Sequence, residues 1–207
     1  DPLVSHNNNV NGFFNILLMC KKYNIKRLVY ASSSSVYGDN NQLPKIEQNI
    51  GSVLSPYAAT KKINEIYAEL FYKTYNIETI RLRYFNVFGE NQDPNGMYAA
   101  VIPKFINLML NNQSPAINGD GSFSRDFTFI DNVVQANYLA LNTDNQETFG
   151  KIFNIGCGNN ITIKNMTLII KELTGFKGDI IYKDERKGEI PHSHADISNA
   201  KKYLNYN

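Results

Sequence analysis

Apolar and polar positions recur along the chain with two periods, one typical of helices and one typical of strands. Residues 8–24 carry apolar side chains at helical spacing, and residues 26–32 follow as a short run rich in strand formers. Residues 56–75 are predicted as a helix, with Ser55 as N-cap and Pro56 in the first helical position. The apolar residues of this helix that share one face are Ile63, Ile66, Tyr67 and Leu70. The pattern therefore predicts a helix, a strand and a second helix.

The rest of the chain continues this alternation. Residues 79–89 are predicted as a buried strand whose end, with Asn86 and Gly89, would deliver side chains to a site. Further helical or strand patterns follow at 98–111, 126–130, 131–143, 152–155, 162–174 and 179–182. Strands that alternate with helices indicate an α/β fold with a mostly parallel sheet.

Composition and charge exclude several kinds of partner. With 207 residues, of which 43% are hydrophobic, the chain can bury a sizeable core. Its 21 basic and 19 acidic residues are interspersed, so we expect neither a nucleic-acid nor a membrane partner. No apolar run approaches the roughly 20 residues of a membrane span, and the start has no signal-peptide pattern. Cys20 and Cys157 lack metal-ligand spacing and are expected to be buried thiols, so we predict a cytoplasmic protein.

Tyr57 and Lys61 are the first candidates for chemistry. Four residues apart on a helix, they share a face with their Cβ atoms about 5 to 6 Å apart. A free tyrosine has a pKa of about 10, and a cation at that distance favours the phenolate, which suits a proton acceptor at neutral pH. The same spacing also occurs on exposed helices that have no catalytic role. The pair therefore gains weight only in combination with other residues.

Four consecutive serines, Ser32 to Ser35, follow the apolar part of the first predicted strand. Hydroxyl groups at the carboxyl end of a strand lie where open α/β sheets bind ligands. Because Tyr57 begins the next predicted helix, one of these hydroxyls could share a hydrogen bond with the substrate oxygen that Tyr57 deprotonates. The alternative interpretation is a serine-rich turn.

Together, Y-A-S-S-S-S-V-Y-G at 30–38 and Y-x-x-x-K at 57–61 make the chain resemble the extended short-chain dehydrogenase/reductase superfamily. Within it, the chain is similar to nucleotide-sugar epimerases that act at C4 of a UDP-linked hexose. The resemblance implies an enzyme that uses NAD and a UDP-sugar. Its catalytic residues would be Ser33, Ser34, Tyr57 and Lys61. Tyr57 would take the O4 proton, NAD would take hydride from C4, and the hydride would return to the other face of a 4-keto sugar.

The resemblance also implies binding roles. Four further segments match the family in order: N-N-V-N-G (8–12), R-Y-F-N-V-F-G (83–89), residues 119–132 and residues 185–196. The implied cofactor-binding residues are Asn9, Ser32, Tyr57, Lys61 and Tyr84. The implied substrate-binding residues are Ser33, Asn86, Ala100, Val101, Asn118, Arg125, Arg186, Glu189 and Ser193. No metal is implied. Plainer roles stay open, because the arginines could form surface ion pairs, Asn86 could cap a turn and Asn9 could cap its helix.

Small residues bear on which substrate is expected. Dehydratases of this superfamily carry an Asp-Glu pair after the catalytic Thr, where this chain has Ser34 and Ser35, so a 4,6-elimination is not expected. Ser193 falls at a pocket-wall position where a small side chain leaves room for a 2-acetamido group, and Ala99 and Ala100 are also small. The resemblance therefore favours interconversion of UDP-GlcNAc and UDP-GalNAc. The alternatives are a UDP-glucuronate 4-epimerase, a ketoreductase of the same superfamily, or a non-catalytic module that binds sugar nucleotides.

The same resemblance implies a domain organisation. The expected fold is a partial Rossmann-like, doubly wound parallel sheet with a small α/β substrate-binding subdomain. Residues 1–86, rejoined by 127–156, would belong to the NAD-binding domain, and residues 87–126 with 157–207 to the UDP-sugar subdomain. The chain has no initiator Met and no glycine-rich turn for a cofactor pyrophosphate, so we expect a piece of a longer protein that binds NAD poorly alone and is inactive. The full-length protein is expected to form a homodimer through the helix at 56–75.

Overall fold

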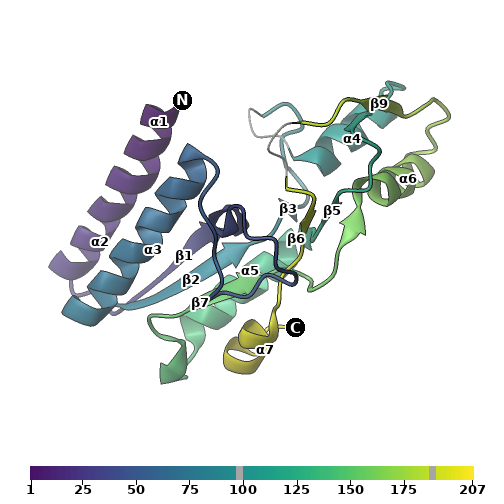
Figure 1. The fold of residues 1–207 in the computed structure, drawn as a ribbon. Coiled ribbons are helices and arrows are strands. Elements are labelled where there is room, and N and C mark those ends of the chain that lie inside the picture. Colours follow the sequence, from purple (N-terminus) through teal and green to yellow (C-terminus); the bar gives the residue numbers. More distant parts are fainter. Residues whose placement is uncertain (97–99, 187–189) are drawn as a thin grey trace.

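The computed structural model describes residues 1–96, 100–186 and 190–207, which form a central parallel sheet flanked by helices and a smaller lobe to one side (Figure 1). In chain order the elements are α1 (Pro2–His6), η1 (Asn7–Asn11), α2 (Gly12–Lys22), β1 (Arg27–Ser33), η2 (Ser34–Tyr37), α3 (Pro56–Tyr75), β2 (Glu78–Tyr84), β3 (Val87–Phe88), α4 (Val101–Leu110), β4 (Ala116–Asn118), β5 (Ser124–Arg125), β6 (Thr128–Phe129), α5 (Ile130–Asn142), η3 (Gln146–Thr148), β7 (Ile152–Ile155), β8 (Ile161–Thr162), α6 (Ile163–Thr174), β9 (Ile181–Lys183), β10 (His192–Ser193) and α7 (Ser198–Leu204).

The central sheet has the strand order β1-β2-β7, and all of its strands run parallel. Helix α3 packs on β1 and β2 with α2 beside it, while α5 packs on the opposite face and α7 covers β7 next to α5 (Figure 1). This arrangement confirms the predicted α/β fold with parallel strands. Parallel strands place their carboxyl ends at one edge of the sheet, so β1 and β2 deliver the residues that follow them to the same place.

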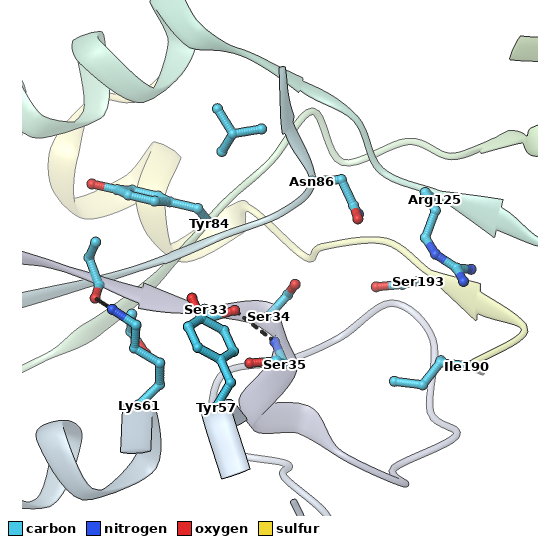
Figure 2. Close-up of a pocket in the computed structure, with 13 residues that line it drawn as sticks. Ser33, Ser34, Ser35, Tyr57, Lys61, Tyr84, Asn86, Arg125, Ile190 and Ser193 are labelled. Atoms are coloured by element: carbon cyan, nitrogen blue, oxygen red, sulfur yellow. Dashed lines mark hydrogen bonds between the residues drawn. The ribbon is translucent and has the colours of Figure 1, made fainter. Parts of the chain in front are cut away.

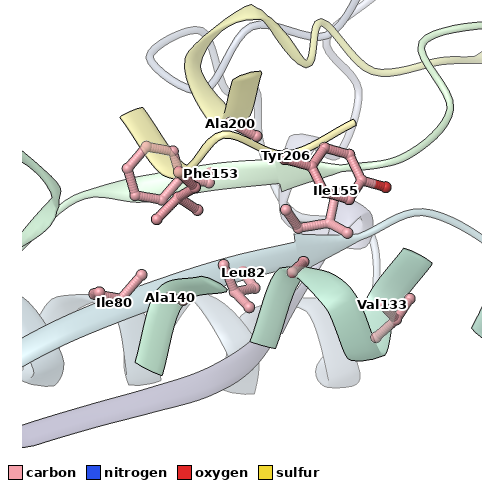
Figure 3. Packing of buried hydrophobic residues seen from close by; sticks show 10 residues of the cluster. Ile80, Leu82, Val133, Ala140, Phe153, Ile155, Ala200 and Tyr206 are labelled. Carbon is pink, nitrogen blue, oxygen red and sulfur yellow. The ribbon is translucent and has the colours of Figure 1, made fainter. Parts of the chain in front are cut away.

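Strand β2 is buried on both of its faces. Ile80 and Leu82 belong to the main hydrophobic core, where they pack with residues of α5, α7 and β7 (Figure 3). The alternate residues Arg81 and Arg83 point the other way, toward α3, because successive side chains of a strand face opposite sides. An alternation of Ile or Leu with Arg is typical of a strand with one solvent-exposed face, yet both arginines are buried. Their burial is possible because the Arg81 Nη1 donates to the Glu65 carbonyl oxygen at 3.1 Å and Arg83 pairs with the Glu65 carboxylate.

Helix α3 begins and ends as the sequence predicts. The Ser55 side chain accepts a hydrogen bond from the Ala58 backbone N–H at 3.1 Å, and Asn76 ends the helix in a left-handed conformation. Its apolar stripe, however, is only partly buried: Tyr67 packs against Phe14, while Ile66 and Leu70 are exposed. The buried face of α3 is instead formed by small, polar and aromatic residues: Ala58, Thr60, Asn64, Glu65, Ala68 and Phe71.

Three sequence predictions differ from the structure in detail. The first helical segment begins at Pro2 rather than near residue 8, because Asp1 caps it by accepting a hydrogen bond from Leu3. The strand predicted at 79–89 is broken after Tyr84, and Asn86 has a positive φ of 32°. Cys157 is exposed, so the expectation of two buried thiols was wrong for one of them.

The smaller lobe is built around α4 and α6. These helices pack on each other and, with Ile117 of β4 and Phe176, enclose a separate hydrophobic cluster. Strand β4 pairs in parallel with β9, and β5 pairs with both β10 and β8. The segment at 98–111, for which the pattern predicted a helix or a strand, contains α4; residues 98 and 99 lie outside the described residues. No helix in the described ranges is long and apolar enough to cross a membrane.

Candidate active site

A cavity of about 590 Å³ opens at the carboxyl ends of β1 and β2 (Figure 2). The strand register places Ser33 opposite Tyr84, so the last residues of the two strands reach the cavity together. The predicted site residues that line it are Ser32, Ser33, Ser34, Tyr57, Lys61, Tyr84, Asn86, Arg125 and Ser193. Ala31, Ser35, Val87 and Ile190 also line the cavity and were not among the predicted site residues.

Ser33 lies at the turn where β1 becomes the short helix η2. Its Oγ accepts a hydrogen bond from the Ser35 backbone N–H at 3.1 Å, which caps η2. A hydroxyl that accepts one hydrogen bond can still donate its own hydrogen, so the cap fixes the Oγ position while leaving the O–H available to a ligand. The neighbouring Ser35 Oγ is buried and has no hydrogen-bond partner among the described residues. The serine segment is therefore both a turn and a wall of the cavity.

Tyr57 and Lys61 reach the cavity from the first two turns of α3 (Figure 2). The Lys61 Nζ lies 5.8 Å from the centre of the Tyr57 ring, and it donates a hydrogen bond to the Ala31 carbonyl oxygen at 3.0 Å. That bond holds the ammonium against β1, next to the strand that carries the serines. Burial lowers the pKa of Lys61 below its ordinary value. The two side chains thus converge on one side of the cavity, as their spacing in the sequence suggests.

The opposite wall of the cavity comes from the segments that carry Asn86, Arg125 and Ser193. The Asn86 Nδ2 donates to the Asp126 carbonyl oxygen at 3.0 Å. The Arg125 Nη1 donates to the Ser124 carbonyl oxygen at 2.9 Å and to the Pro191 carbonyl oxygen at 3.0 Å. Pairing of β5 with β10 sets Ser193 beside Arg125. Backbone contacts therefore fix the amide and the guanidinium on this wall.

Tyr84 has its ring in the cavity wall and its hydroxyl turned toward α5. The Asn137 Nδ2 donates to the Tyr84 hydroxyl at 2.8 Å. Burial raises the pKa of Tyr84 above its ordinary value, although the hydrogen bond with Asn137 acts in the opposite direction. Tyr84 therefore presents an aromatic surface to the cavity rather than an acidic hydroxyl.

A second cavity, of about 280 Å³, adjoins the first one. The two share Asn86 and Arg125 in their walls, and the second extends toward the smaller lobe. The other predicted site residues that line it are Val101, Asn118 and Arg186. The two cavities together could hold an elongated molecule whose centre lies at the shared amide and guanidinium.

Two of the predicted residues that the structure describes line neither cavity. Asn9 lies in η1, and its Nδ2 donates to the Thr60 Oγ1 at 3.0 Å, directly before Lys61 on α3. Ala100 is the N-cap of α4, next to Val101. Glu189, like Ala99, lies outside the described residues.

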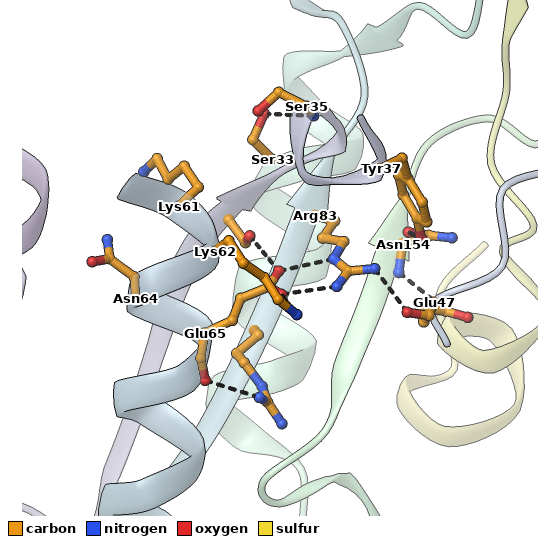
Figure 4. Close-up of polar contacts among 12 residues, drawn as sticks. Ser33, Ser35, Tyr37, Glu47, Lys61, Lys62, Asn64, Glu65, Arg83 and Asn154 are labelled. Atoms are coloured by element: carbon orange, nitrogen blue, oxygen red, sulfur yellow. Dashed lines mark hydrogen bonds and ion pairs between the residues drawn. The ribbon is translucent and has the colours of Figure 1, made fainter. Parts of the chain in front are cut away.

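A buried polar network lies beneath the catalytic candidates (Figure 4). Glu65 of α3 pairs with Arg83 of β2, and the Glu65 Oε1 also accepts a hydrogen bond from the Ser32 Oγ at 2.6 Å. Burial by itself raises the pKa of Glu65, but the hydrogen bonds and charge of Arg83 outweigh it, so the pKa lies below its ordinary value of 4.5. Sequence reasoning missed this pair, although Glu65 follows Lys61 by one helical turn and Arg83 directly precedes Tyr84.

No group of three or more His, Cys, Asp or Glu side chains in the described ranges could hold a metal ion. The polar groups around the larger cavity are hydroxyls, an ammonium, an amide and a guanidinium. Hydroxyls and an ammonium suit proton transfer from a sugar alcohol, and a planar guanidinium suits phosphate.

Comparison with known proteins places this site in a family. Residues 1–156 match the family described as "NAD dependent epimerase/dehydratase family". A putative UDP-glucose 4-epimerase of Methanocaldococcus jannaschii is 44% identical over 201 residues, which cover 97% of this chain and 64% of that protein. The chain therefore belongs to the NAD dependent epimerase/dehydratase family, which confirms the resemblance drawn from its motifs.

Solved structures agree with this assignment. The UDP-N-acetylglucosamine 4-epimerase from Methanobrevibacter ruminantium M1, in complex with UDP-N-acetylmuramic acid, superposes with a TM-score of 0.94 at 40% identity and covers all of this chain and 65% of that one. The UDP-glucuronic acid 4-epimerase from Bacillus cereus, in complex with UDP-glucuronic acid and NAD, gives a TM-score of 0.88 at 30% identity, with 98% of this chain and 62% of that one covered. The chain thus spans a little under two thirds of the length of these relatives.

Proposed function

We propose that the protein is an NAD-dependent UDP-sugar 4-epimerase. The observation that carries the proposal is the convergence of Tyr57, Lys61 and Ser33 on one cavity at the carboxyl ends of two parallel strands. Membership of the epimerase/dehydratase family supports it, as does the similarity to solved structures of UDP-sugar 4-epimerases. Because the chain spans only part of those relatives, activity is to be tested on the complete polypeptide.

The residues around the cavity fit a nicotinamide cofactor. Lys61 has two N–H groups beyond the one that bonds Ala31, and Tyr84 lines the same cavity with an aromatic surface. Together with Asn9 and Ser32, these would be the cofactor-side residues. When bound, NAD would supply reversible hydride transfer at C4 of the sugar.

The protein's own residues would handle the proton and the nucleotide. Tyr57, as the phenolate, would take the O4 proton and later return it, while the Ser33 hydroxyl would hydrogen-bond the same oxygen. The Lys61 ammonium would stabilise the phenolate by its proximity. Arg125 and Arg186 would bind the diphosphate, with Asn86 at the junction of the two cavities.

For the sugar, we propose UDP-GlcNAc and UDP-GalNAc. The side chain of Ser193 is small and lines the cavity opposite the serine turn, which leaves room for a 2-acetamido group. The similarity to a solved UDP-N-acetylglucosamine 4-epimerase supports this choice. UDP-glucuronate is the second candidate, because a UDP-glucuronic acid 4-epimerase is also similar. A binding module without activity would have no use for Tyr57, Lys61 and Ser33 in one cavity.

The test is turnover of UDP-GlcNAc, UDP-GalNAc, UDP-glucose, UDP-galactose and UDP-glucuronate by the complete polypeptide with NAD, followed by chromatography of the products. We expect the acetylated pair to be preferred, and Ser193→Tyr to reduce turnover of that pair at least about ten-fold relative to UDP-glucose. Ser198→Tyr, an exposed position on α7, is the matched control. Preference for UDP-glucuronate or the non-acetylated pair would overturn the choice of sugar, and absence of any turnover would overturn the enzymatic function.

We also propose a homodimer and a cytoplasmic location for the complete protein. Ile16 and Met19 of α2 and Ile66 and Leu70 of α3 are exposed on neighbouring helices (Figure 1). A second copy of the chain would cover these apolar side chains, since the same face on both subunits can pack on itself. The unpaired Cys20 and Cys157 are consistent with a reducing compartment.

A further inference from the structure

Asp126 is a fully buried carboxylate, 0% exposed, in the segment between β5 and β6. Its Oδ1 accepts a hydrogen bond from the Cys157 backbone N–H at 2.8 Å. Its Oδ2 accepts two more, from the backbone N–H groups of Gly158 and Ala195, each at 3.1 Å. One side chain therefore holds the loop that follows β7 and the segment that follows β10.

The backbone of Asp126 extends this set of contacts to the cavity wall. Its N–H donates to the Ser193 carbonyl oxygen at 2.8 Å, and its own carbonyl oxygen accepts from the Asn86 Nδ2 at 3.0 Å. Arg125 is its direct neighbour in sequence. Of the predicted substrate-side groups of the larger cavity, Arg125 is thus the sequence neighbour of Asp126, while Asn86 and Ser193 each bond directly to the Asp126 backbone.

The local packing leaves little freedom for this carboxylate. A Cβ added at Gly156 would lie 2.7 Å from the Asp126 Oδ2 and 3.0 Å from the Ala195 Cβ, so the site requires glycine there. A buried carboxylate is costly unless it is hydrogen-bonded, and bonds from N–H groups to an ionised oxygen are stronger than neutral ones. The hydrogen bonds from the three backbone N–H groups offset that cost. The carboxylate in turn holds the backbone segments of those N–H groups in one arrangement.

We infer that Asp126 is a positioning residue for substrate, which sets Asn86, Arg125 and Ser193 at the distances that a UDP-sugar requires. The inference rests on the proposed function and deepens it. Asp126 itself does not line either cavity. It acts through the backbone segments that it joins. Its loss is therefore expected to weaken binding of the nucleotide rather than to slow the chemical step at Tyr57.

Calorimetric titration with UDP and steady-state kinetics, both on the complete polypeptide, test this inference. Asp126→Asn keeps the shape of the side chain but replaces one acceptor oxygen by an N–H₂ group that faces backbone donors. We expect the Kd for UDP and the KM for the UDP-sugar to rise at least about ten-fold, with kcat changed by less than about three-fold. In Gly156→Ala the added methyl group would displace the same carboxylate, so we also expect the Kd for UDP to rise.

The matched control is Glu47→Gln. Glu47 is also a buried carboxylate, and it accepts hydrogen bonds from the Asn154 backbone N–H at 3.0 Å and the Asn199 Nδ2 at 2.8 Å, but it lines neither of the two cavities. We expect it to lower the melting temperature without raising the Kd for UDP.

Each outcome bears on one proposal. If the unmodified protein does not bind UDP, the proposed function fails before the role of Asp126 is reached. If the unmodified protein binds UDP and the Asp126→Asn variant binds it equally well, the positioning role is overturned. The same holds if Glu47→Gln weakens UDP binding as much, or if both Asp126→Asn and Gly156→Ala fail to fold, because the role of Asp126 would then be structural.

Discussion

Arg83 and Glu65 form a bidentate ion pair in which both side chains are only 1% exposed. The Arg83 Nε lies 2.8 Å from the Glu65 Oε1, and the Arg83 Nη2 lies 2.8 Å from the Glu65 Oε2. The pair joins β2 to α3, and the hydrogen bond from Ser32 adds β1. Two charges in the interior are tolerated because each satisfies the other and the remaining donors and acceptors have partners. The pair therefore fixes α3, with Tyr57 and Lys61, against the strand that ends in Ser33.

Removal of one member of this pair should be strongly destabilising. We expect Arg83→Met to lower the free energy of unfolding by about 3 to 5 kcal/mol, because Glu65 would be left as a buried charge without its main partner. The double variant Arg83→Met with Glu65→Gln should lose less than the sum of the two single variants. Urea unfolding of all three measures the coupling, and additive losses would show that the two residues are energetically independent.

The same pair predicts a dependence of stability on acid. The pKa of Glu65 lies below its ordinary value of 4.5 in the folded protein, so its contribution is fully present above that value. As the pH falls through the lowered pKa of the folded state, the carboxylate is protonated and the contribution is lost. Thermal unfolding between neutral pH and about pH 3 should therefore show a smaller loss of stability for Glu65→Gln than for the unmodified protein. Equal losses would contradict this prediction.

Tyr57→Phe should separate catalysis from binding. Loss of the phenol oxygen removes the proposed proton acceptor, so we expect turnover to fall by roughly 10²- to 10⁴-fold while the Kd for UDP stays within about three-fold. Tyr57 is 42% exposed, so the free energy of unfolding should change by less than about 0.5 kcal/mol. Tyr67→Phe on the same helix is the control and should keep its activity. A Tyr57→Phe enzyme with ordinary turnover would remove the basis of the proposed mechanism.

Lys61 should set the alkaline limit of activity. Because burial lowers the pKa of Lys61, its ammonium is lost at a lower pH than that of a free lysine with its ordinary value of 10.5. We therefore expect kcat/KM to fall on the alkaline side below that pH, and Lys61→Arg to move the fall to higher pH, since a guanidinium stays charged. The measurement is the pH profile of kcat/KM. Lys73→Arg, at an exposed position on the same helix, is the control and should leave the pH profile unchanged. If Lys61→Arg also left the profile unchanged, the alkaline limit would have another source.

The exposed apolar residues of α3 should govern association. Ile66 and Leu70 are 57% and 50% exposed, and a charge at either position would be buried without a partner in a dimer that uses this face. We expect Ile66→Arg to convert the complete protein to a monomer in sedimentation velocity, while Leu173→Arg on α6, which is also exposed, leaves the dimer intact. A dimer that survives Ile66→Arg would place the interface elsewhere.

Local signals were sufficient to predict several elements and to single out Ser33, Tyr57 and Lys61, which the structure brings to one cavity. Ser55 and Pro56 mark the start of α3 because an N-cap and a first-turn proline act within a few residues. The spacing of Tyr57 and Lys61 predicts one helix face for the same reason. The break after β2 was not predicted, because the positive φ of Asn86 and its bond to Asp126 depend on a segment distant in sequence.

The residues that hold the site together were beyond the reach of such signals. Nothing local in the sequence marks Glu65 and Arg83 as a buried pair, and Ile66 and Leu70 share the apolar face of their helix yet are exposed. Asp126 appears in the motif only as the neighbour of Arg125, although it bonds residues from two later segments. In each case the partner is remote along the chain, and no period or spacing encodes it.

The sequence by itself determined the alternation of helices and strands as far as β2, the start of α3, and the serine, tyrosine and lysine groups of the predicted chemistry, because these depend on neighbours a few residues away. Only the tertiary structure decided which face of α3 is buried, which charges are paired in the interior, and how Asn86, Arg125 and Ser193 meet across the cavity from Tyr57. The physical reason is that the cost of burying a charge or exposing an apolar group is set by the groups that fold against it, and those come from distant parts of the chain.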